Sequence, residues 1–335
     1  MAELRQIVAD PTSSRATSEQ LPQGRLLDLS IVIVSWNTRD LLEACLQSVL
    51  RQCPGPMDRM ISVEVLVVDN GSADGAPETV RQAFPQVHLI ENEDNPGFAR
   101  ANNQAIQVCR GRYVLLLNPD TDVRPGATDA LVRFMDEHPE AGAAGPLVLN
   151  PDETIQRSCH RAPTIFREFW RMFHLDVIRR VSEYAMETWT HDRARSVDVV
   201  QGACLILRRE ALDRVGLLDE RFFIYSEEVD LCQRLRQDGW TINWVPWAQI
   251  VHYGGQSTSQ VGEAMFLQLY RAKILYFRKH FGVRAAQLYK LILLLAASTR
   301  LTFVPLVWFV RRSDRRQIIV MAHHYRRLIG HLRNT

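Results

Sequence analysis

The chain has 335 residues, of which 46% are hydrophobic and 23% are charged. This composition is that of an ordinary globular protein, and it excludes a collagen-like chain, a disulfide scaffold and a largely disordered protein. The net charge of +2 gives no support to a protein that coats nucleic acid. The length predicts one large domain or two smaller ones.

A polar leader, residues 1–27, has no apolar segment of the kind a signal peptide needs, and we expect it to be disordered. From residue 28 onward, short β-branched apolar runs alternate with helical segments, which is typical of a mostly parallel sheet with crossover helices. The predicted strands are 29–36, 63–70, 87–91, 112–118 and 141–148, and the predicted helices are 38–51, 76–84, 97–109 and 126–138.

The second half of the chain is less regular. Residues 151–196 have weak periodicity and are interpreted as an insertion or lid. A strand-like run follows at 197–209, then a helix that begins near Glu227, then two short strands at 242–245 and 249–251. The six cysteines form neither a Cys-x-x-Cys pair nor a Cys/His cluster, so we expect reduced thiols in a cytosolic compartment.

The C-terminal segment, residues 261–335, is basic. Residues 271–335 hold 14 Lys or Arg and one acidic residue, Asp314, a net charge of +13, whereas the preceding 270 residues carry a net −11. Such an asymmetry predicts an anionic partner, either a membrane surface or a nucleic acid. The aliphatic runs within this segment favour lipid over nucleic acid.

A basic amphipathic stretch at 262–281 precedes an apolar run at 291–310 that is long enough to span a bilayer. Arg300 lies at the centre of this run and Pro305 interrupts it. An arginine at the bilayer centre costs about 2.5 to 3.5 kcal/mol on insertion scales, which favours an interfacial or re-entrant segment. The alternative is a helical hairpin that packs on the domain.

Polar side chains follow three of the predicted strands, at Ser35–Asn37, Asp69–Ser72 and Asn118–Asp122. Each set alone is compatible with a turn. Because ligands bind at the carboxyl ends of strands in such sheets, the three sets together predict a pocket for a polar ligand.

A nucleoside diphosphate would suit this pocket. Asn95 and Pro96 are expected to cap and open a helix, whose free N–H groups attract an anion. Asp120 is a candidate ligand for a divalent cation. Neither a G-x-G-x-x-G nor a G-x-x-x-x-G-K-[ST] motif is present, which excludes the common dinucleotide and ATP loops.

Several motifs occur in the order seen in family-2 inverting glycosyltransferases, which the chain resembles over residues 29–255. They are IVIVSWNTRDLLEACLQSVL (31–50), VVDNGSADG (67–75), NPGFARANNQAI (95–106), LLLNPDTD (115–122) and SEEVDLCQRLRQDGW (226–240). The NPGFA and LLNPDT variants resemble the rhamnosyltransferase-type branch. The resemblance implies a GT-A-like fold in residues 28–260, with a nucleotide-sugar half at 28–150 and an acceptor and catalytic half at 151–260.

The resemblance also implies roles for individual residues. It places the nucleotide sugar against Ser35, Asn37, Asp69, Asn70, Gly97 and Asn103, and the acceptor against Gln201, Gly202 and Ala203. It places Mg²⁺ or Mn²⁺ at Asp120 and His252. Asn118 stands where many members of the family have a first aspartate, which leaves one charged metal ligand. The alternative for His252 is a structural histidine at a strand end.

The family's catalytic base is the second carboxylate of an acidic pair at the start of a helix, which here is Glu228, with Glu227 as the next candidate. Glu228 replaces the usual aspartate. Asp230 precedes Arg234 by four residues, and this spacing favours a helical salt bridge. A single displacement needs one base and no enzyme nucleophile.

The predicted function is therefore transfer of a sugar, with L-rhamnose from dTDP-rhamnose as the first choice, to a hydroxyl of a lipid-linked saccharide in bacterial cell-surface polysaccharide biosynthesis. The predicted enzyme is cytoplasmic and peripheral on the inner face of the membrane, with no nucleic-acid partner. The alternatives are a transferase that uses a UDP-sugar and an inactive membrane-associated scaffold of the same fold. A nucleotidyltransferase would need a glycine-rich loop where this sequence has SWNTRD.

Overall fold

The computed structural model describes residues 27–51, 61–255, 261–310 and 315–333. It divides into two compact units. The first comprises residues 1–162 and 185–260, and the second comprises residues 163–184 and 261–335. The predicted disordered leader lies outside the described residues except for Leu27, which already belongs to the first strand.

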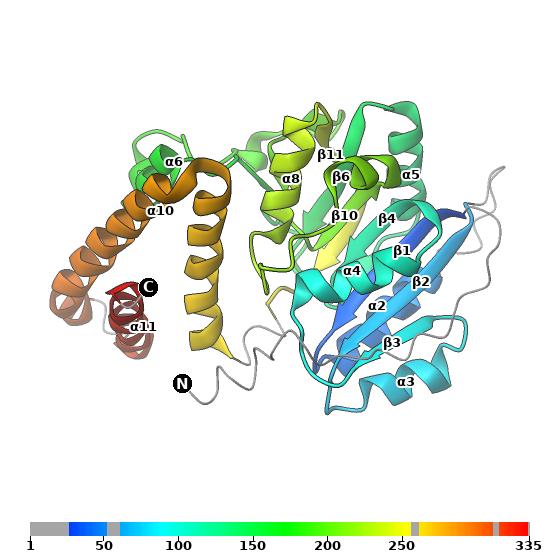
Figure 1. Ribbon diagram of the computed structural model, residues 1–335, viewed down its shortest axis with the longest axis horizontal. Helices are drawn as coiled ribbons and strands as arrows, with labels where there is room; N and C mark the ends of the chain where they lie inside the picture. The colour runs from blue at the N-terminus through cyan, green and yellow to red at the C-terminus, as the bar shows by residue number, and fades with distance from the viewer. Residues whose placement is uncertain (1–26, 52–60, 256–260, 311–314, 334–335) are drawn as a thin grey trace. The chain divides into compact units, whose positions relative to one another are not determined.

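The first unit is built on a nine-stranded sheet, in the order β3-β2-β1-β4-β10-β6-β11-β5 with β8 paired to β11 (Figure 1). Its strands are β1 (Leu27–Ser35), β2 (Val63–Asn70), β3 (His88–Asn92), β4 (Gly111–Leu117), β5 (Thr121–Val123), β6 (Ala141–Leu149), β8 (Arg195–Ser196), β10 (Cys204–Arg208) and β11 (Thr241–His252). Strands β3, β2, β1 and β4 are parallel, whereas β10 runs antiparallel to both β4 and β6. The sheet is therefore mixed and mostly parallel.

Helices of the first unit cover the sheet because its strands are apolar on both sides. They are α2 (Arg39–Leu50), α3 (Ala76–Ala83), α4 (Phe98–Val108), α5 (Ala127–Glu137), α7 (Arg209–Val215) and α8 (Glu227–Gln237). In Figure 1, α4 and α8 lie over the face of the sheet that is toward the viewer. Seven consecutive residues of β1, from Leu29 to Ser35, are buried, as expected for a strand that is covered on both faces.

The structure corrects two strand predictions. The run at 197–209 is not one strand, since β9 (Val199–Val200) pairs with β7 (Cys159–His160) in a small separate sheet and β10 begins only at Cys204. The two short strands predicted at 242–245 and 249–251 are one strand, β11, whose register shifts between Val245 and Gln249. Pro246 lies in this shift, where the lack of an N–H donor interrupts the ladder.

The second unit is helical. It contains α6 (Ile165–Met172), the short helix η1 (Leu175–Val177), α10 (Gly262–Val310) and α11 (Arg315–Arg333). The segment 151–196, interpreted as an insertion or lid, divides between the two units. Residues 163–184 cluster with the C-terminal helices, and the rest clusters with the sheet, where it includes the short helix η2 (Met186–Thr188). Helix α10 bends at Gly282, whose φ of 84° lies in the left-handed region.

A buried ion cluster holds α6 to α10. The carboxylate of Glu168 accepts hydrogen bonds from Lys273 Nζ at 3.1 Å, from an Arg171 guanidinium nitrogen at 2.6 Å and from the Tyr289 hydroxyl at 3.3 Å. Burial alone would raise the pKa of Glu168, but the charges of Lys273 and Arg171 outweigh it and lower that pKa below its ordinary value of 4.5. The carboxylate is therefore ionised at neutral pH.

We expect Glu168→Leu to lower the free energy of unfolding at pH 7 by about 3 to 5 kcal/mol, because it leaves the largely buried Lys273, and Arg171 beside it, without their anion. Since the pKa of Glu168 is lowered in the folded state, its stabilisation is present above pH 4.5 and is lost as the pH falls further. Urea unfolding followed by circular dichroism measures both effects. Glu263→Leu is the matched control, because it removes a more exposed ion pair, with Arg327. If this variant lost more than about 1 kcal/mol of unfolding free energy, the larger effect expected at Glu168 could not be attributed to burial.

Candidate active site

The polar residues at the ends of β1 and β2 lie side by side. Ser35 and Asp69 are register partners on these two parallel strands, and Asn70 pairs with Asn92 at the end of β3. Asn118 follows the end of β4, which is the other neighbour of β1. The predicted convergence of these strand ends on one edge of the sheet is confirmed.

Asp69 has the environment of a ligand-binding carboxylate. It is 2% exposed, and its Oδ2 accepts a hydrogen bond from the backbone N–H of Ser72 at 2.8 Å. Burial raises the pKa of this carboxyl. Its second oxygen, Oδ1, is buried and has no hydrogen-bond partner among the described residues. Because an unsatisfied buried acceptor is costly, this oxygen is placed to accept a hydrogen bond from a bound molecule.

The loop after β1 is bonded to the loop after β2. The backbone N–H of Asn37 donates to Ser72 Oγ at 2.9 Å, and Asn37 Oδ1 accepts from the N–H of Ala73 at 2.8 Å. Asn37 has a φ of 50°, a left-handed conformation that asparagine tolerates. Ser35 Oγ lies 3.1 Å from Thr38 Oγ1. Ser35, at the end of β1, therefore lies beside Asp69, and Asn37 holds the loop after β1 against the loop that follows Asp69.

Asn70 and Asn103 are both committed to internal hydrogen bonds. Asn70 accepts from Asn92 Nδ2 at 3.0 Å and donates to Asn95 Oδ1 at 3.2 Å. Asn103 donates to the carbonyl of Leu218 at 2.8 Å, and its Oδ1 accepts from the N–H of the same residue at 3.1 Å. Asn103 therefore fixes the loop before α8. Its contact with a nucleotide sugar stays a prediction.

The start of α4 differs from the expectation that Asn95 and Pro96 cap and open this helix. The helix begins at Phe98, and Gly97 occupies the capping position with a φ of 92°. Asn95 instead closes a turn, since its Oδ1 accepts from the N–H of Gly97 at 3.0 Å. The N–H of Phe98 donates to the carbonyl oxygen of Phe223 at 2.6 Å, which ties this loop to the segment before α8.

The two predicted metal ligands are adjacent. His252 Nε2 lies 3.2 Å from Asp120 Oδ1, and both side chains are buried. Gln156 Nε2 donates to Asn150 Oδ1 and to the His252 carbonyl, so its Oε1 faces His252 Nδ1 at 2.6 Å and that nitrogen carries the proton. In the neutral imidazole the lone pair of Nε2 then points toward Asp120 and toward Asn118 Nδ2, which is 3.4 Å away.

This pair fits a divalent cation. A carboxylate oxygen and an imidazole lone pair face each other, and such an arrangement favours a positive charge between them. Within the described part of the chain, no three His, Cys, Asp or Glu side chains are placed to hold a metal ion together. The protein would therefore supply Asp120 and His252, while water and phosphate oxygens would complete the shell, as is common for Mg²⁺.

The acidic pair opens α8 as predicted. Tyr225 and Ser226, immediately before it, have φ values of 71° and 68°, conformations that cost free energy in residues other than glycine. Glu227 is 5% exposed, and its pKa is raised well above 4.5, mainly by burial and then by the charge of Glu228. Glu228 is partly exposed. A turn held in strained geometry thus places the buried Glu227 and the partly exposed Glu228, whose Oε2 is also buried, at a helix start.

Gly202 lies between the acidic pair of α8 and the segment that contains Asp120. A Cβ atom on Gly202 would lie 3.9 Å from the Cβ of Glu228. The carbonyl of the next residue, Ala203, accepts a hydrogen bond from the N–H of Asn118 at 3.0 Å. The predicted acceptor-side segment, Gln201–Ala203, therefore lies between the candidate base and the motif that contains Asp120.

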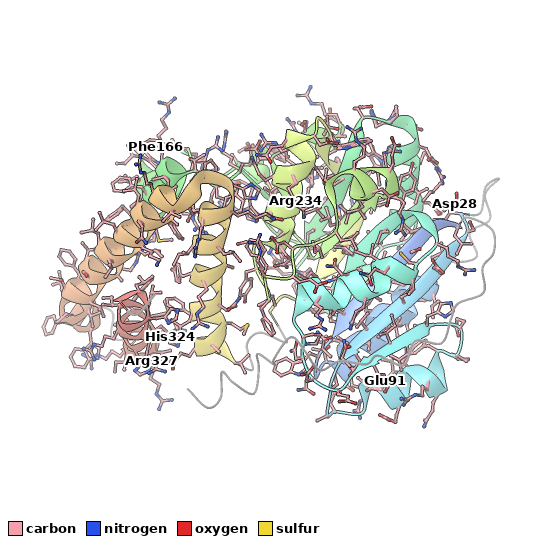
Figure 2. All side chains as sticks on the ribbon, in the orientation of Figure 1. Asp28, Glu91, Phe166, Arg234, His324 and Arg327 are labelled. Atoms are coloured by element: carbon pink, nitrogen blue, oxygen red, sulfur yellow. The ribbon has the colours of Figure 1, made fainter. Side chains whose placement is uncertain are left out.

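Asp230 has the structural role that its spacing indicates. It is completely buried, and Arg234 Nε donates to its Oδ2 at 2.9 Å. The same guanidinium donates to the carbonyls of Val215, Gly216 and Leu217, which precede α8. Arg234 is labelled on this helix in Figure 2.

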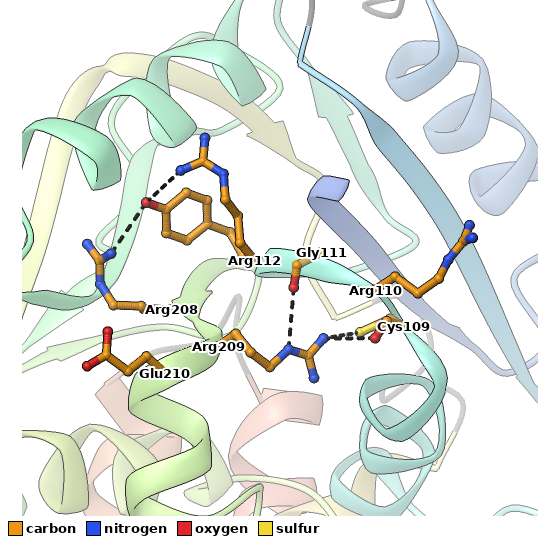
Figure 3. A pocket seen from close by; sticks show the side chains of 8 residues that line it. Cys109, Arg110, Gly111, Arg112, Arg208, Arg209 and Glu210 are labelled. Atoms are coloured by element: carbon orange, nitrogen blue, oxygen red, sulfur yellow. Dashed lines mark hydrogen bonds between the residues drawn. The ribbon is translucent and has the colours of Figure 1, made fainter. Parts of the chain in front are cut away.

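A cavity of about 470 Å³ lies at the opposite end of β4 (Figure 3). Two of the arginines that line it donate hydrogen bonds to backbone carbonyls near helix ends: Arg208 to Met135 in α5, and Arg209 to Ile106 in α4. These arginines therefore cap helices. The cavity lies at the amino end of β4, away from the strand ends that carry Asp69 and Asn118, and it is not the candidate active site.

Comparison with known proteins decides the family. The model of glycosyl transferase family 2 matches residues 30–216. The chain belongs to this family. An N-acetylglucosaminyl-diphospho-decaprenol L-rhamnosyltransferase of Mycobacterium tuberculosis is 32% identical over 251 residues, which cover 69% of this chain and 78% of that protein. An O-antigen biosynthesis protein of Myxococcus xanthus is 28% identical over 71% of this chain and 18% of its own length.

Solved structures confirm the GT-A-like fold of this family member. A mannosyltransferase of Pyrobaculum calidifontis, solved with GDP-Man and Mn²⁺, has a TM-score of 0.54 at 17% identity and covers 93% of this chain and 88% of its own. GalNAc-T7, solved with UDP, GalNAc and Mn²⁺, has a TM-score of 0.51 at 17% identity, over 74% of this chain and 47% of that one. The predicted rhamnosyltransferase-like glycosyltransferase is thus confirmed at the level of family and fold.

Proposed function

We propose that this protein is an inverting, metal-dependent hexosyltransferase that moves L-rhamnose from dTDP-rhamnose to a hydroxyl of a polyprenyl-diphosphate-linked saccharide. One observation carries the proposal: Gly202 and Ala203 connect Glu228 to the Asn118–Asp120 motif and its partner His252. The name of the M. tuberculosis relative supports both the rhamnosyl donor and the lipid-linked acceptor. Catalysis is assigned to residues 28–260 and membrane contact to residues 261–335.

In this proposal the donor nucleotide binds at the ends of β1 and β2. Asp69 Oδ1, which is buried without a partner among the described residues, accepts a hydrogen bond from the nucleoside. The loop that contains Asn37 and Ser72 shapes the same pocket through the bonds described above. Gly97 keeps the start of α4 close to this edge.

Glu228 acts as the general base in the transfer step. Its carboxylate takes the proton of the acceptor hydroxyl while that oxygen attacks the anomeric carbon and the bond to the nucleoside diphosphate breaks. Gly202 leaves room for the acceptor beside this carboxylate, because it has no side chain. Asp120 and His252 would hold the cation, which when bound supplies positive charge that stabilises the leaving diphosphate.

A UDP-sugar donor is the second candidate. GalNAc-T7 was solved with UDP on the same fold, and rhamnose is favoured only by the M. tuberculosis rhamnosyltransferase relative. An inactive scaffold is disfavoured because an unsatisfied buried oxygen at Asp69 and a strained turn before Glu227 are costs that a binding or catalytic site explains.

Calorimetry with dTDP-rhamnose, UDP-glucose, UDP-galactose and GDP-mannose tests the site, first with Mg²⁺ or Mn²⁺ and then with EDTA. We expect one donor to bind only with metal, and Asp120→Ala to weaken that binding by about 10-fold or more. The matched control is Asp122→Ala, because the Asp122 carboxylate lies 3.8 Å from Arg51 and 4.0 Å from Arg124 instead. If none of the four donors binds under any condition, the proposed function is wrong.

A further inference from the structure

The second arm of α10, residues 283–306, is apolar on two sides. Its inner side is buried within the helical unit through Tyr289, Ile292, Leu293, Ala296 and Ala297. Its outer side carries a row of exposed apolar residues, here called the apolar ridge: Leu288, Leu291, Leu295, Phe303 and Leu306 are 47 to 59% exposed. The exposed Ser298, Thr299 and Thr302 divide this ridge into two apolar stretches, and a monomeric soluble protein rarely leaves such stretches in water.

The arginine in the middle of this arm does not belong to the ridge. A terminal nitrogen of Arg300 donates to the carbonyl of Met172 at 2.5 Å, and the other donates to the carbonyl of Ala296 at 3.2 Å. The guanidinium also lies 5.4 Å from the centre of the Tyr325 ring. Arg300 therefore stabilises the carboxyl end of α6, and its charge is directed into the unit.

The neighbours of this arm argue against a transmembrane position. By length and composition, α10 contains one apolar stretch that is able to cross a membrane. In the structure, 28% of that stretch is buried. Arg300 binds α6, and α6 carries the buried Glu168 and its partner Arg171. Moving this arm to the bilayer centre would break these contacts or bring several charges into hydrocarbon.

The positive charge of the helical unit indicates that the apolar ridge binds an anionic surface. Arg284 precedes the ridge on the same arm, and Arg326 is exposed on α11. Its neighbour Arg327, labelled in Figure 2, is also exposed and pairs with Glu263. Arg316 is exposed at the start of the same helix. Together with the net charge of +13 in residues 271–335, these cations complement an anionic surface.

We infer that the apolar ridge inserts in the plane of an anionic lipid bilayer, so that α10 lies on the membrane and does not cross it. Apolar side chains of an interfacial helix reach the boundary between headgroups and acyl chains, while arginines beside them bind lipid phosphates. This inference rests on the proposed membrane contact and adds its residues and its orientation. It does not depend on which sugar is transferred.

Co-sedimentation of the full chain with vesicles tests the surface. We expect binding to phosphatidylcholine vesicles that contain phosphatidylglycerol, and at least 10-fold weaker binding to phosphatidylcholine alone. The double variant Leu291→Glu/Leu295→Glu should lose at least 10-fold in affinity for the anionic vesicles, whereas Val108→Glu, at an exposed apolar residue of α4, should bind as the unchanged protein does. Equal binding by the double variant, or equal binding to both lipids, would overturn the inference.

Protease digestion of inverted inner-membrane vesicles tests the orientation. A C-terminal epitope tag is expected to be digested, because an in-plane α10 leaves α11 on the cytoplasmic side. Protection of the tag would show a spanning helix and contradict the inference. Circular dichroism on the same variants checks that they are folded, and calorimetry measures whether they bind a nucleotide sugar. A protein that binds lipid but no nucleotide sugar would contradict the proposed function and leave this inference standing.

Discussion

Replacing Glu228 by Gln is expected to lower the rate of sugar transfer by about 100- to 10,000-fold, the range that a general base contributes. Glutamine preserves the size of the side chain but has no carboxylate to take the proton of the acceptor hydroxyl. Binding of the nucleotide sugar should remain within about 2-fold, because Glu228 lies beside Gly202, on the proposed acceptor side, and not at Asp69. Steady-state rates and donor calorimetry on the same protein measure the two quantities.

Glu227→Gln is the matched control for this prediction. Because burial and the charge of Glu228 raise the pKa of Glu227, this residue favours the neutral form that glutamine imitates. We therefore expect Glu227→Gln to retain most of its activity. If Glu227→Gln abolished transfer while Glu228→Gln retained it, the assignment of the base would have to pass to Glu227.

Gly97→Ala is expected to reduce transfer by about 100-fold, through displacement of the base. A Cβ atom at this position would lie 2.5 Å from the carbonyl oxygen of Phe223, closer than real Cβ contacts come. Phe223 lies a few residues before Glu228 and is held by the N–H of Phe98. A displacement of about 1 Å at a catalytic group is sufficient for an effect of this size.

Gly126→Ala is the control for alanine at a capping glycine of positive φ where no steric contact arises. Gly126 caps α5 with a φ of 78° and a ψ of 1°, and a Cβ atom there would meet nothing within 4 Å. Gly97, with a φ of 92° and a ψ of 166°, lies in a region that alanine adopts at higher cost, so its variant combines that strain with the contact. We expect Gly126→Ala to cost about 1 to 2 kcal/mol of stability, as a left-handed alanine does, with kcat unchanged. Equal activities of the two variants would show that the contact between Gly97 and Phe223 does not position the base.

The sequence predicts the parallel half of the sheet well. Strands β1, β2 and β4 are nearly continuous apolar runs that end in polar turns, and the structure places them as neighbours. The start of α8 is also predicted correctly, because an acidic pair before a helical pattern is a strong local signal. Both signals are contained within a few consecutive residues.

Contacts between distant segments are what the sequence does not predict. Gln156, 96 residues before His252 in the chain, determines which ring nitrogen of that histidine carries the proton. Phe223 contacts the loop at Gly97, and no sequence motif links these two segments. The antiparallel insertion of β10 between β4 and β6 likewise depends on tertiary packing. Residues 163–184 cluster with α10, which begins about 80 residues later, through contacts that include the ion pair of Glu168 with Lys273.

The most direct test of the account is to incubate the purified protein with dTDP-rhamnose, Mg²⁺ and a polyprenyl-diphosphate-linked N-acetylglucosamine, and to determine the product by NMR. The account predicts a rhamnosyl product whose anomeric configuration is opposite to that of the donor, and no product with Glu228→Gln. A product with retained configuration would contradict the single displacement by Glu228. The absence of product with this donor and with UDP-sugars would contradict the transferase itself.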